Sequence, residues 1–120
     1  MHTYSFETLE VWKTSKEYVK LIYVCIKKFP VEERFGLTSQ LTRAAISVTC
    51  NIAEGNSKNS LKERVRYIDI AYGSLMETLS LIIISYELNY INEGEYQNLR
   101  QLVDAISNKL NGLKKYIEKQ

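Results

Sequence analysis

Hydrophobic residues recur along most of the chain at alternating intervals of three and four positions, which is the periodicity of an amphipathic α-helix. The clearest run covers residues 61–86, and a second one covers residues 96–117. Shorter runs of the same kind cover residues 12–29 and 37–52. The pattern predicts four helices, and the heptad-like spacing of the last run favours near-parallel packing in a bundle.

Residues that interrupt or start helices stand between these runs. Pro30 lacks a backbone donor and clashes with the preceding turn, so the first helix is expected to end at Phe29. Gly55 is expected to take the left-handed conformation that ends the second helix. Ser60 and Asn92 each precede a glutamate by three residues, which is the spacing of a capping box at a helix start. The last two helices are then separated by about three residues and must be antiparallel. The expected fold is all-α, an up-down-up-down antiparallel four-helix bundle.

Length and composition agree with this fold. A chain of 120 residues with 45% hydrophobic content can build one core, so residues 1–120 are expected to form a single domain. Five glycines and one proline leave few turns for a many-stranded sheet. No apolar run approaches the roughly 20 residues that span a bilayer, and the N-terminal segment lacks the basic start of a signal peptide. We therefore expect a cytoplasmic protein with no membrane partner.

The residues that carry most enzyme chemistry are scarce. Cys25 and Cys50 lie in helical patterns without the close spacing of a metal or redox pair, so both are expected to be reduced and packed. His2, the single histidine, lies in a segment expected to fray, which leaves no His-dependent triad or metal cage in the bundle. The hydroxyls of Ser47 and Ser74 have no base of the usual kind nearby. We expect no enzymatic activity, no cofactor and no metal.

Charge is distributed unevenly along the predicted bundle, although the net charge is only +2. The start of the first helix, the second connection and the end of the last helix should share one end, which then carries roughly +4, against roughly −2 at the other. A basic end gathers phosphates, and such binding weakens as salt rises. The competing interpretation is an ordinary solvated lysine surface. The residues expected to contact phosphates of RNA or DNA are Lys58, Lys62, Arg64 and Arg66.

Polar residues also recur on the second helix. We expect four of them to form a polar network that fixes the end of this helix: Gln40, Arg43, Asn51 and Glu54.

Two features indicate protein interfaces. The nine tyrosines offer large apolar rings with polar tips, a profile that is enriched at interfaces. The helix over residues 61–86 also has apolar residues outside its main stripe, so either self-association covers them or this helix is the central one of a monomer. These residues are Ile70, Ala71, Met76, Ile83 and Ile84.

Sequence segments distributed over nearly the whole chain carry a family resemblance. The chain resembles the four-helix-bundle proteins encoded in intervening sequences of bacterial large-subunit ribosomal RNA genes, and the related accessory variability protein of diversity-generating retroelements. The family pattern usually has a proline where this chain has Thr49, so a straighter second helix is expected here. The segments are FETLEVWK at residues 6–13, FP at 29–30, ERFGLTSQL at 33–41, RAAIS at 43–47, NIAEG at 51–55 and AYGSL at 71–75.

The resemblance implies a homo-oligomer, with pentameric rings among relatives, and no assigned enzymatic activity. For the retroelement relatives it also implies nucleic-acid binding and a reverse-transcriptase partner. The leading hypothesis is a non-catalytic, homo-oligomeric helical protein that binds RNA or DNA through its basic end. The alternative is a protein-interaction adaptor without nucleic-acid binding, in which the acidic end and the tyrosines recognise a protein partner.

Overall fold

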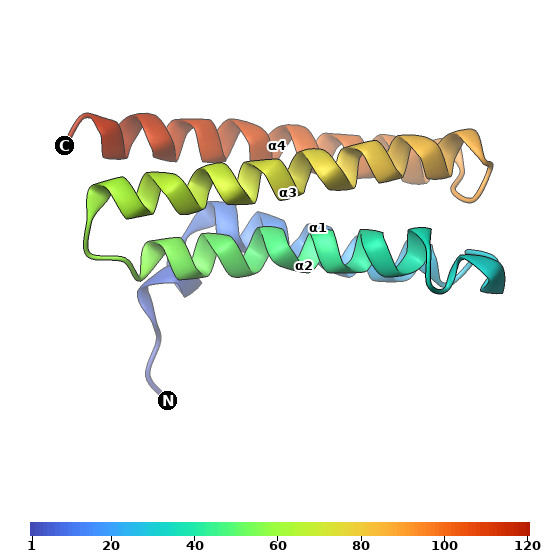
Figure 1. Ribbon diagram of the computed structural model, residues 1–120, viewed down its shortest axis with the longest axis horizontal. Coiled ribbons are helices and arrows are strands. Elements are labelled where there is room, and N and C mark those ends of the chain that lie inside the picture. The colour runs from blue at the N-terminus through green and yellow to red at the C-terminus, as the bar shows by residue number, and fades with distance from the viewer.

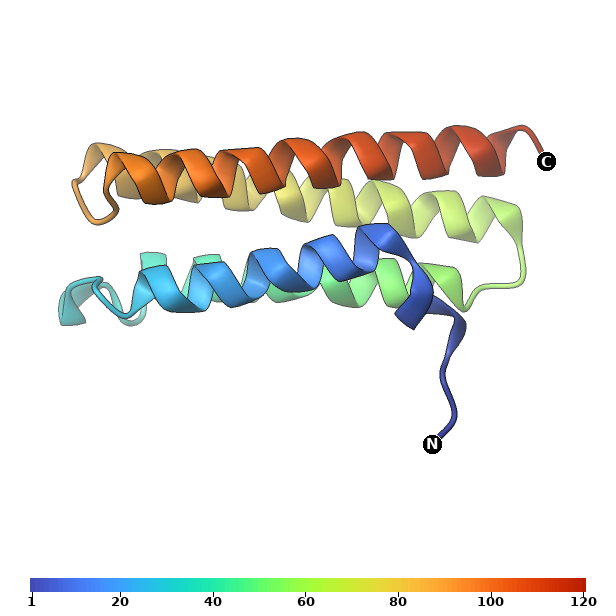
Figure 2. The same ribbon diagram turned by 180° about the vertical axis from the view of Figure 1, so that it is seen from behind.

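The computed structural model describes residues 1–120, and four long helices dominate it (Figure 1). Helices α1 and α3 each pack against both α2 and α4, so α1 and α3 occupy diagonal corners of the bundle. Consecutive helices run in opposite directions, and Figure 2 shows the same arrangement from behind. The predicted antiparallel four-helix bundle is confirmed. The helices are α1 (Glu10–Ile26), α2 (Leu37–Asn56), α3 (Leu61–Glu87) and α4 (Glu93–Glu118), with short 3-10 turns η1 (Ser5–Thr8) and η2 (Val31–Glu33).

Each helix buries one face in a shared core. On α3 the hydrophobic run predicted from the sequence is only partly buried, because Leu61 and Tyr72 remain 39% and 36% exposed. A helix at the corner of a bundle touches two neighbours, so its buried face is centred between them and includes small polar residues. The buried residues of α3 are Ile68, Ala71, Leu75, Thr78, Leu81, Ile82 and Ser85.

The buried polar side chains all have hydrogen-bond partners. Ser85 donates from its hydroxyl to the Leu81 carbonyl oxygen, 2.8 Å away. Tyr18 of α1 is fully buried and donates to the hydroxyl oxygen of Thr78 on α3. The sequence pattern did not assign Tyr18 or Thr78 to the core.

The predicted helix starts are confirmed. Ser60 caps α3, because its hydroxyl oxygen accepts from the Glu63 backbone N–H at 3.0 Å. Asn92 and Glu95 form a complete capping box at the start of α4, with hydrogen bonds of 2.8 and 2.9 Å. The α1 helix ends at Ile26, three residues before the predicted end, and a turn then carries Phe29 into the core.

The predicted end of α2 is wrong. Gly55 has no left-handed conformation and lies inside the helix, which continues to Asn56. A Cβ atom on Gly55 would lie 2.6 Å from the Cβ of Tyr67, so the glycine is there to let α2 and α3 approach. The one residue with a positive φ is Asn89, at 65°, in the connection over residues 88–92. That connection is two residues longer than predicted and uses Asn89 to leave α3.

Two further expectations concern α2. The helix runs without interruption through Thr49, as the absence of a proline there predicts. Cys50 is exposed on its outer face, so the expectation that both cysteines pack in the core is wrong for Cys50 and right for Cys25. Cys50 lies two positions after the buried Val48, which rotates it about 200° away from the core-facing side.

The α3 helix is long and apolar enough to cross a membrane, by length and composition alone. An 18-residue window of it has a mean hydropathy of 1.4, and 39% of that window is buried. Such a helix is also found in the core of bundles, and here α3 packs against two neighbours. The finding corrects the expectation that no segment of the chain approaches the apolar character of a membrane span.

Candidate nucleic-acid interface

One end of the bundle collects three separate parts of the chain. The start of α1, the connection between α2 and α3, and the end of α4 all lie there (Figure 1). The topology therefore brings the lysines of α3 and α4 together, as the charge pattern predicted. This end is called the basic end below, and the opposite one the acidic end.

Two of the four predicted phosphate contacts serve the fold. Arg64 is partly buried and donates from Nε to the Lys58 carbonyl oxygen at 2.7 Å, which ties the α2–α3 connection to α3. The Lys58 ammonium lies 3.9 Å from the Glu54 carboxylate and 5.0 Å from the centre of the Tyr67 ring. Both cations are therefore held against the protein.

The other two predicted contacts are exposed. Lys62 lies in the first turn of α3 and forms no ion pair. Arg66 lies one turn later, with its guanidinium 3.5 Å from the Glu63 carboxylate. Exposed pairs of this kind contribute little, about 0–1 kcal/mol, so Arg66 can exchange its partner at low cost. Of the four predicted residues, Lys62 is the most accessible to a phosphate.

Two lysines at the end of α4, outside the predicted set, have the same character. Lys115 and Lys119 at the end of α4 are exposed and form no ion pair. The ion pair between Lys114 and Asp69, 2.9 Å apart, joins α4 to α3 at this level of the bundle. The hydrogen bond and the charge of Asp69 raise the pKa of Lys114. We call Lys62, Lys115 and Lys119 the basic patch.

A sequence signal for the α4 lysines was available. Three lysines fall within the last seven residues, where the helix dipole favours cations. The predicted set came from the α2–α3 connection and the start of α3 and left them out, because the register of α4 against α3 decides which lysines share a surface.

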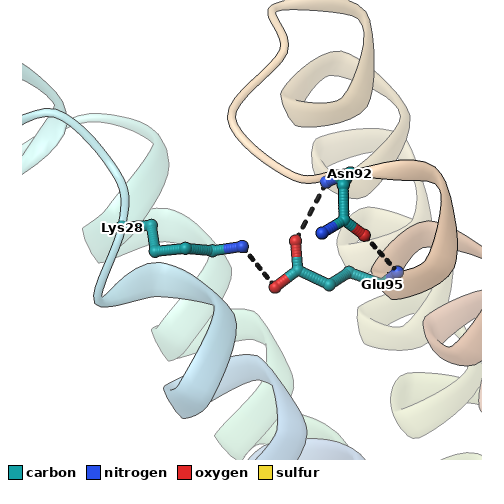
Figure 3. Close-up of polar contacts among 3 residues, drawn as sticks. All are labelled: Lys28, Asn92 and Glu95. Atoms are coloured by element: carbon teal, nitrogen blue, oxygen red, sulfur yellow. Dashed lines mark hydrogen bonds and ion pairs between the residues drawn. The ribbon is translucent and has the colours of Figure 1, made fainter.

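The acidic end carries its own charge network. Lys28 at the end of α1 pairs with Glu95, whose carboxylate also accepts the Asn92 backbone N–H (Figure 3). Burial alone would raise the pKa of Glu95, but the Lys28 ammonium and the Asn92 N–H outweigh it and hold this pKa below its ordinary value. Glu87 and Glu93 have no such partner, which leaves this end acidic.

A pocket of about 170 Å³ opens at the basic end between α2, α3 and α4. Its wall is mainly apolar and includes Ile52, Ile68 and Leu110, with Arg64 beside them. The pocket has room for a small apolar group.

The four polar residues predicted to form one network have separate partners instead. Arg43 donates to the Glu77 carboxylate of α3 at 2.8 Å, and Asn51 donates to the Ser47 carbonyl and hydroxyl oxygens. Glu54 is paired with Lys58 alone, and no hydrogen bond of the Gln40 side chain is formed. Of these residues only Arg43 reaches across to α3, whereas Asn51 bonds within α2 and Glu54 pairs with Lys58 in the connection that follows.

The two serines singled out by the sequence analysis meet at the same α2–α3 contact. The hydroxyl oxygens of Ser47 and Ser74 are 2.9 Å apart, and Asn51 lies beside them. Two short side chains let the helices approach closely while their hydroxyls satisfy each other. No group of three or more His, Cys, Asp and Glu side chains is placed to hold a metal ion.

These features define a small antiparallel four-helix bundle with one basic end. The family model described as 23S rRNA-intervening sequence protein matches residues 7–112, so the chain belongs to that family. A crystal structure of a protein with unknown function from the S23 ribosomal protein family of Bacteroides thetaiotaomicron has the same fold. It is 20% identical in sequence, with a TM-score of 0.79 over 88% of this chain and 98% of that one. A search of curated protein sequences found no match.

Proposed function

We propose that this protein is a non-catalytic, homo-oligomeric RNA- or DNA-binding protein of the cytoplasm. The basic patch of Lys62, Lys115 and Lys119 supplies the phosphate contacts, with Lys58 and Arg66 at its margin. No cofactor or metal takes part.

The observation that carries the proposal is the lack of intramolecular partners in the basic patch. Every lysine of the patch is exposed and forms no ion pair, whereas Lys114 beside it is paired with Asp69. Unpaired lysines on adjacent helices form a local positive field that phosphates can occupy without breaking existing ion pairs. The arrangement suits contacts with the phosphate backbone of a nucleic acid, which carry no information on base sequence.

Fluorescence anisotropy with a labelled RNA hairpin and a labelled DNA duplex of equal length tests the proposal. Three phosphate contacts predict a slope of log K against log salt of about −2.7 for duplex DNA. The double variant Lys62→Glu with Lys119→Glu should weaken binding at least about tenfold and reduce the slope by about 2. Circular dichroism of the variant should be unchanged, because both side chains are exposed.

The matched control is Lys27→Glu together with Lys20→Glu, which makes the same charge change on α1 and its end. Affinity that falls equally in the control reflects net charge alone and contradicts the assignment of the basic patch. Binding that the patch variant leaves unchanged contradicts it as well. A folded protein that binds neither nucleic acid at low salt is better described as a protein-interaction adaptor.

A further inference from the structure

The pocket at the basic end has the size of one small ring. Its volume is about 170 Å³. An engineered protein cavity of roughly 150 Å³ with a similar aliphatic wall binds benzene. Aliphatic side chains from α2, α3 and α4 line the pocket, together with Leu9, which precedes α1. These helix residues are Ile52, Ile68, Leu110, Leu113 and Ile117. The pocket can therefore enclose one aromatic ring or an aliphatic group of similar size.

Arg64, in the first turn of α3, is the one charged residue in the wall of this pocket. Its Nε donates to the Lys58 carbonyl oxygen at 2.7 Å, which holds the side chain against the α2–α3 connection. Its two terminal nitrogens form no hydrogen bond or ion pair within the protein. They are also accessible from outside, because no buried side-chain nitrogen lacks a partner. The pocket thus has a fixed cation with donors to spare.

The pocket wall offers this cation no anion. Neither aspartate nor glutamate lines the pocket, and its other polar lining residues are Asn56, Tyr116 and Gln120. Tyr116 is 66% exposed, so it marks the side on which the pocket opens to solvent. A guanidinium binds a carboxylate through two parallel N–H donors, and such charge-assisted bonds are strengthened in apolar surroundings. An apolar wall with one oriented polar group is typical of small-molecule sites.

We infer that this pocket binds a small monocarboxylate that carries one aromatic ring or a short aliphatic chain. The apolar part lies among the aliphatic side chains of the three helices. The carboxylate accepts hydrogen bonds from the terminal nitrogens of Arg64. A single cation in the wall matches one negative charge, and the volume limits the apolar part to about the size of a benzene ring.

The pocket is separate from the basic patch. None of Lys62, Lys115 and Lys119 lines it, and Arg64 is not a member of the patch. The patch lies at the same end of the bundle, so its positive field attracts small anions toward the pocket as well as phosphates. The inference goes beyond the proposed function and does not rest on it, because the carboxylate site needs no nucleic acid.

Fluorine NMR titration of the full chain with two probes tests the chemistry of the site. The probes are para-fluorobenzoate and its neutral analogue para-fluorobenzamide, which share the same ring. The benzoate should bind at least about tenfold more tightly, because only a carboxylate forms charge-assisted hydrogen bonds with Arg64. Equal affinities would mean that the pocket recognises only the ring and would overturn the inference.

The variant Arg64→Gln tests the role of the guanidinium. Affinity for para-fluorobenzoate should fall about tenfold, whereas affinity for para-fluorobenzamide should stay the same. The unchanged amide probe separates a lost carboxylate partner from a distorted pocket, since Arg64 also holds the α2–α3 connection. The matched control is Arg66→Gln, which makes the same charge change on the same helix at an exposed position outside the pocket. It should leave both affinities unchanged.

A variant that fills the pocket tests its location without changing charge. Leu113 is partly buried in the pocket wall, so Leu113→Trp should occupy part of the space and weaken both probes at least about tenfold. Leu102→Trp makes the same change at another partly buried position of α4 outside this pocket and should leave both affinities unchanged. In the wild-type protein, amide chemical shifts induced by para-fluorobenzoate should concentrate around Ile52, Ile68 and Leu110.

Three further results would overturn the inference. The first is a folded protein that does not bind para-fluorobenzoate at the highest soluble concentration. The second is a loss of benzoate affinity in Arg66→Gln as large as that in Arg64→Gln, which would indicate a response to net charge alone. The third is a set of induced shifts confined to the basic patch. Nucleic acid is absent from these titrations, so a protein that binds the probe but no RNA or DNA would contradict the proposed function and support the carboxylate site.

Discussion

The Tyr18 hydroxyl on α1 donates a hydrogen bond to the Thr78 hydroxyl oxygen on α3, 2.8 Å away, across the diagonal of the bundle. Thr78 in turn donates to the Leu75 carbonyl oxygen at 2.6 Å, so both buried hydroxyls are satisfied. Burial raises the pKa of the Tyr18 phenol, which therefore stays neutral and able to donate. The backbones of α1 and α3 lie at diagonal corners of the bundle, and this bond is a direct polar link between the two helices.

Removing the two partners of this bond should have unequal effects. Tyr18→Phe leaves Thr78 with its own acceptor and should lower the free energy of unfolding by about 1 kcal/mol. Thr78→Val strands the buried Tyr18 donor and should cost about 2 kcal/mol, the larger loss. The double variant should be more stable than Thr78→Val alone, because no buried hydroxyl then lacks a partner. Urea unfolding at constant m value measures this, and equal effects of the two single variants would contradict it.

The close contact at Gly55 predicts an unusual response to alanine. Alanine favours helix by about 1 kcal/mol over glycine, yet at position 55 its Cβ would stand 2.6 Å from the Tyr67 Cβ. Gly55→Ala should therefore destabilise the protein by about 1–3 kcal/mol, as overpacking does. Gly112→Ala in α4, which meets nothing within 4 Å, should instead stabilise it by up to about 1 kcal/mol. Thermal unfolding of the two variants should shift in opposite directions, and a stabilised Gly55→Ala would contradict the contact.

The Glu95 carboxylate predicts a pH dependence at the acidic end. Its pKa in the folded state lies below the ordinary 4.5, so the folded state favours the ionised form. The resulting stability is present above the unfolded pKa and is lost as pH falls through the lower folded pKa. Between about pH 5 and pH 3, wild type should lose more stability than Glu95→Gln, which keeps a capping side chain without the charge. If the free energy of unfolding falls equally with pH in the two proteins, the ion pair between Glu95 and Lys28 contributes nothing to stability.

The two cysteines should differ in reactivity. Cys50 is exposed, whereas Cys25 is buried, and burial raises the pKa of the Cys25 thiol. Native protein should react rapidly with one equivalent of a thiol reagent, and unfolded protein with two. Intact-mass spectra should show a single adduct that Cys50→Ser abolishes. Rapid double labelling of the native protein would mean that α1 opens readily.

Local sequence patterns were sufficient to predict the fold. Helix periodicity depends only on which residues along the chain are apolar, and a cap depends on residues three positions apart, such as Asn92 and Glu95. Both act within a few residues, so the four helices, the starts of α3 and α4 and the antiparallel order could be read from the chain. The gathering of charge at one end followed from that order. The same reasoning selected Lys62, which the structure shows to be exposed and without an ion pair.

Contacts between helices depend on the rotation of each helix about its axis and on its register against its neighbours, and no local sequence pattern specifies either. Only the packed bundle decides that Gly55 is a close contact with Tyr67, that Tyr18 reaches Thr78, and that Cys50 faces outward. It also separated Arg64, tied to the Lys58 carbonyl oxygen, from the free lysines at the end of α4, and gave Arg43 and Asn51 of α2 different partners. A rotation of one helix by a single residue, about 100°, would change every one of these relationships while leaving the hydrophobic periodicity unchanged. Sequence thus determined the elements and their order, and tertiary packing determined which side chains are available to a partner.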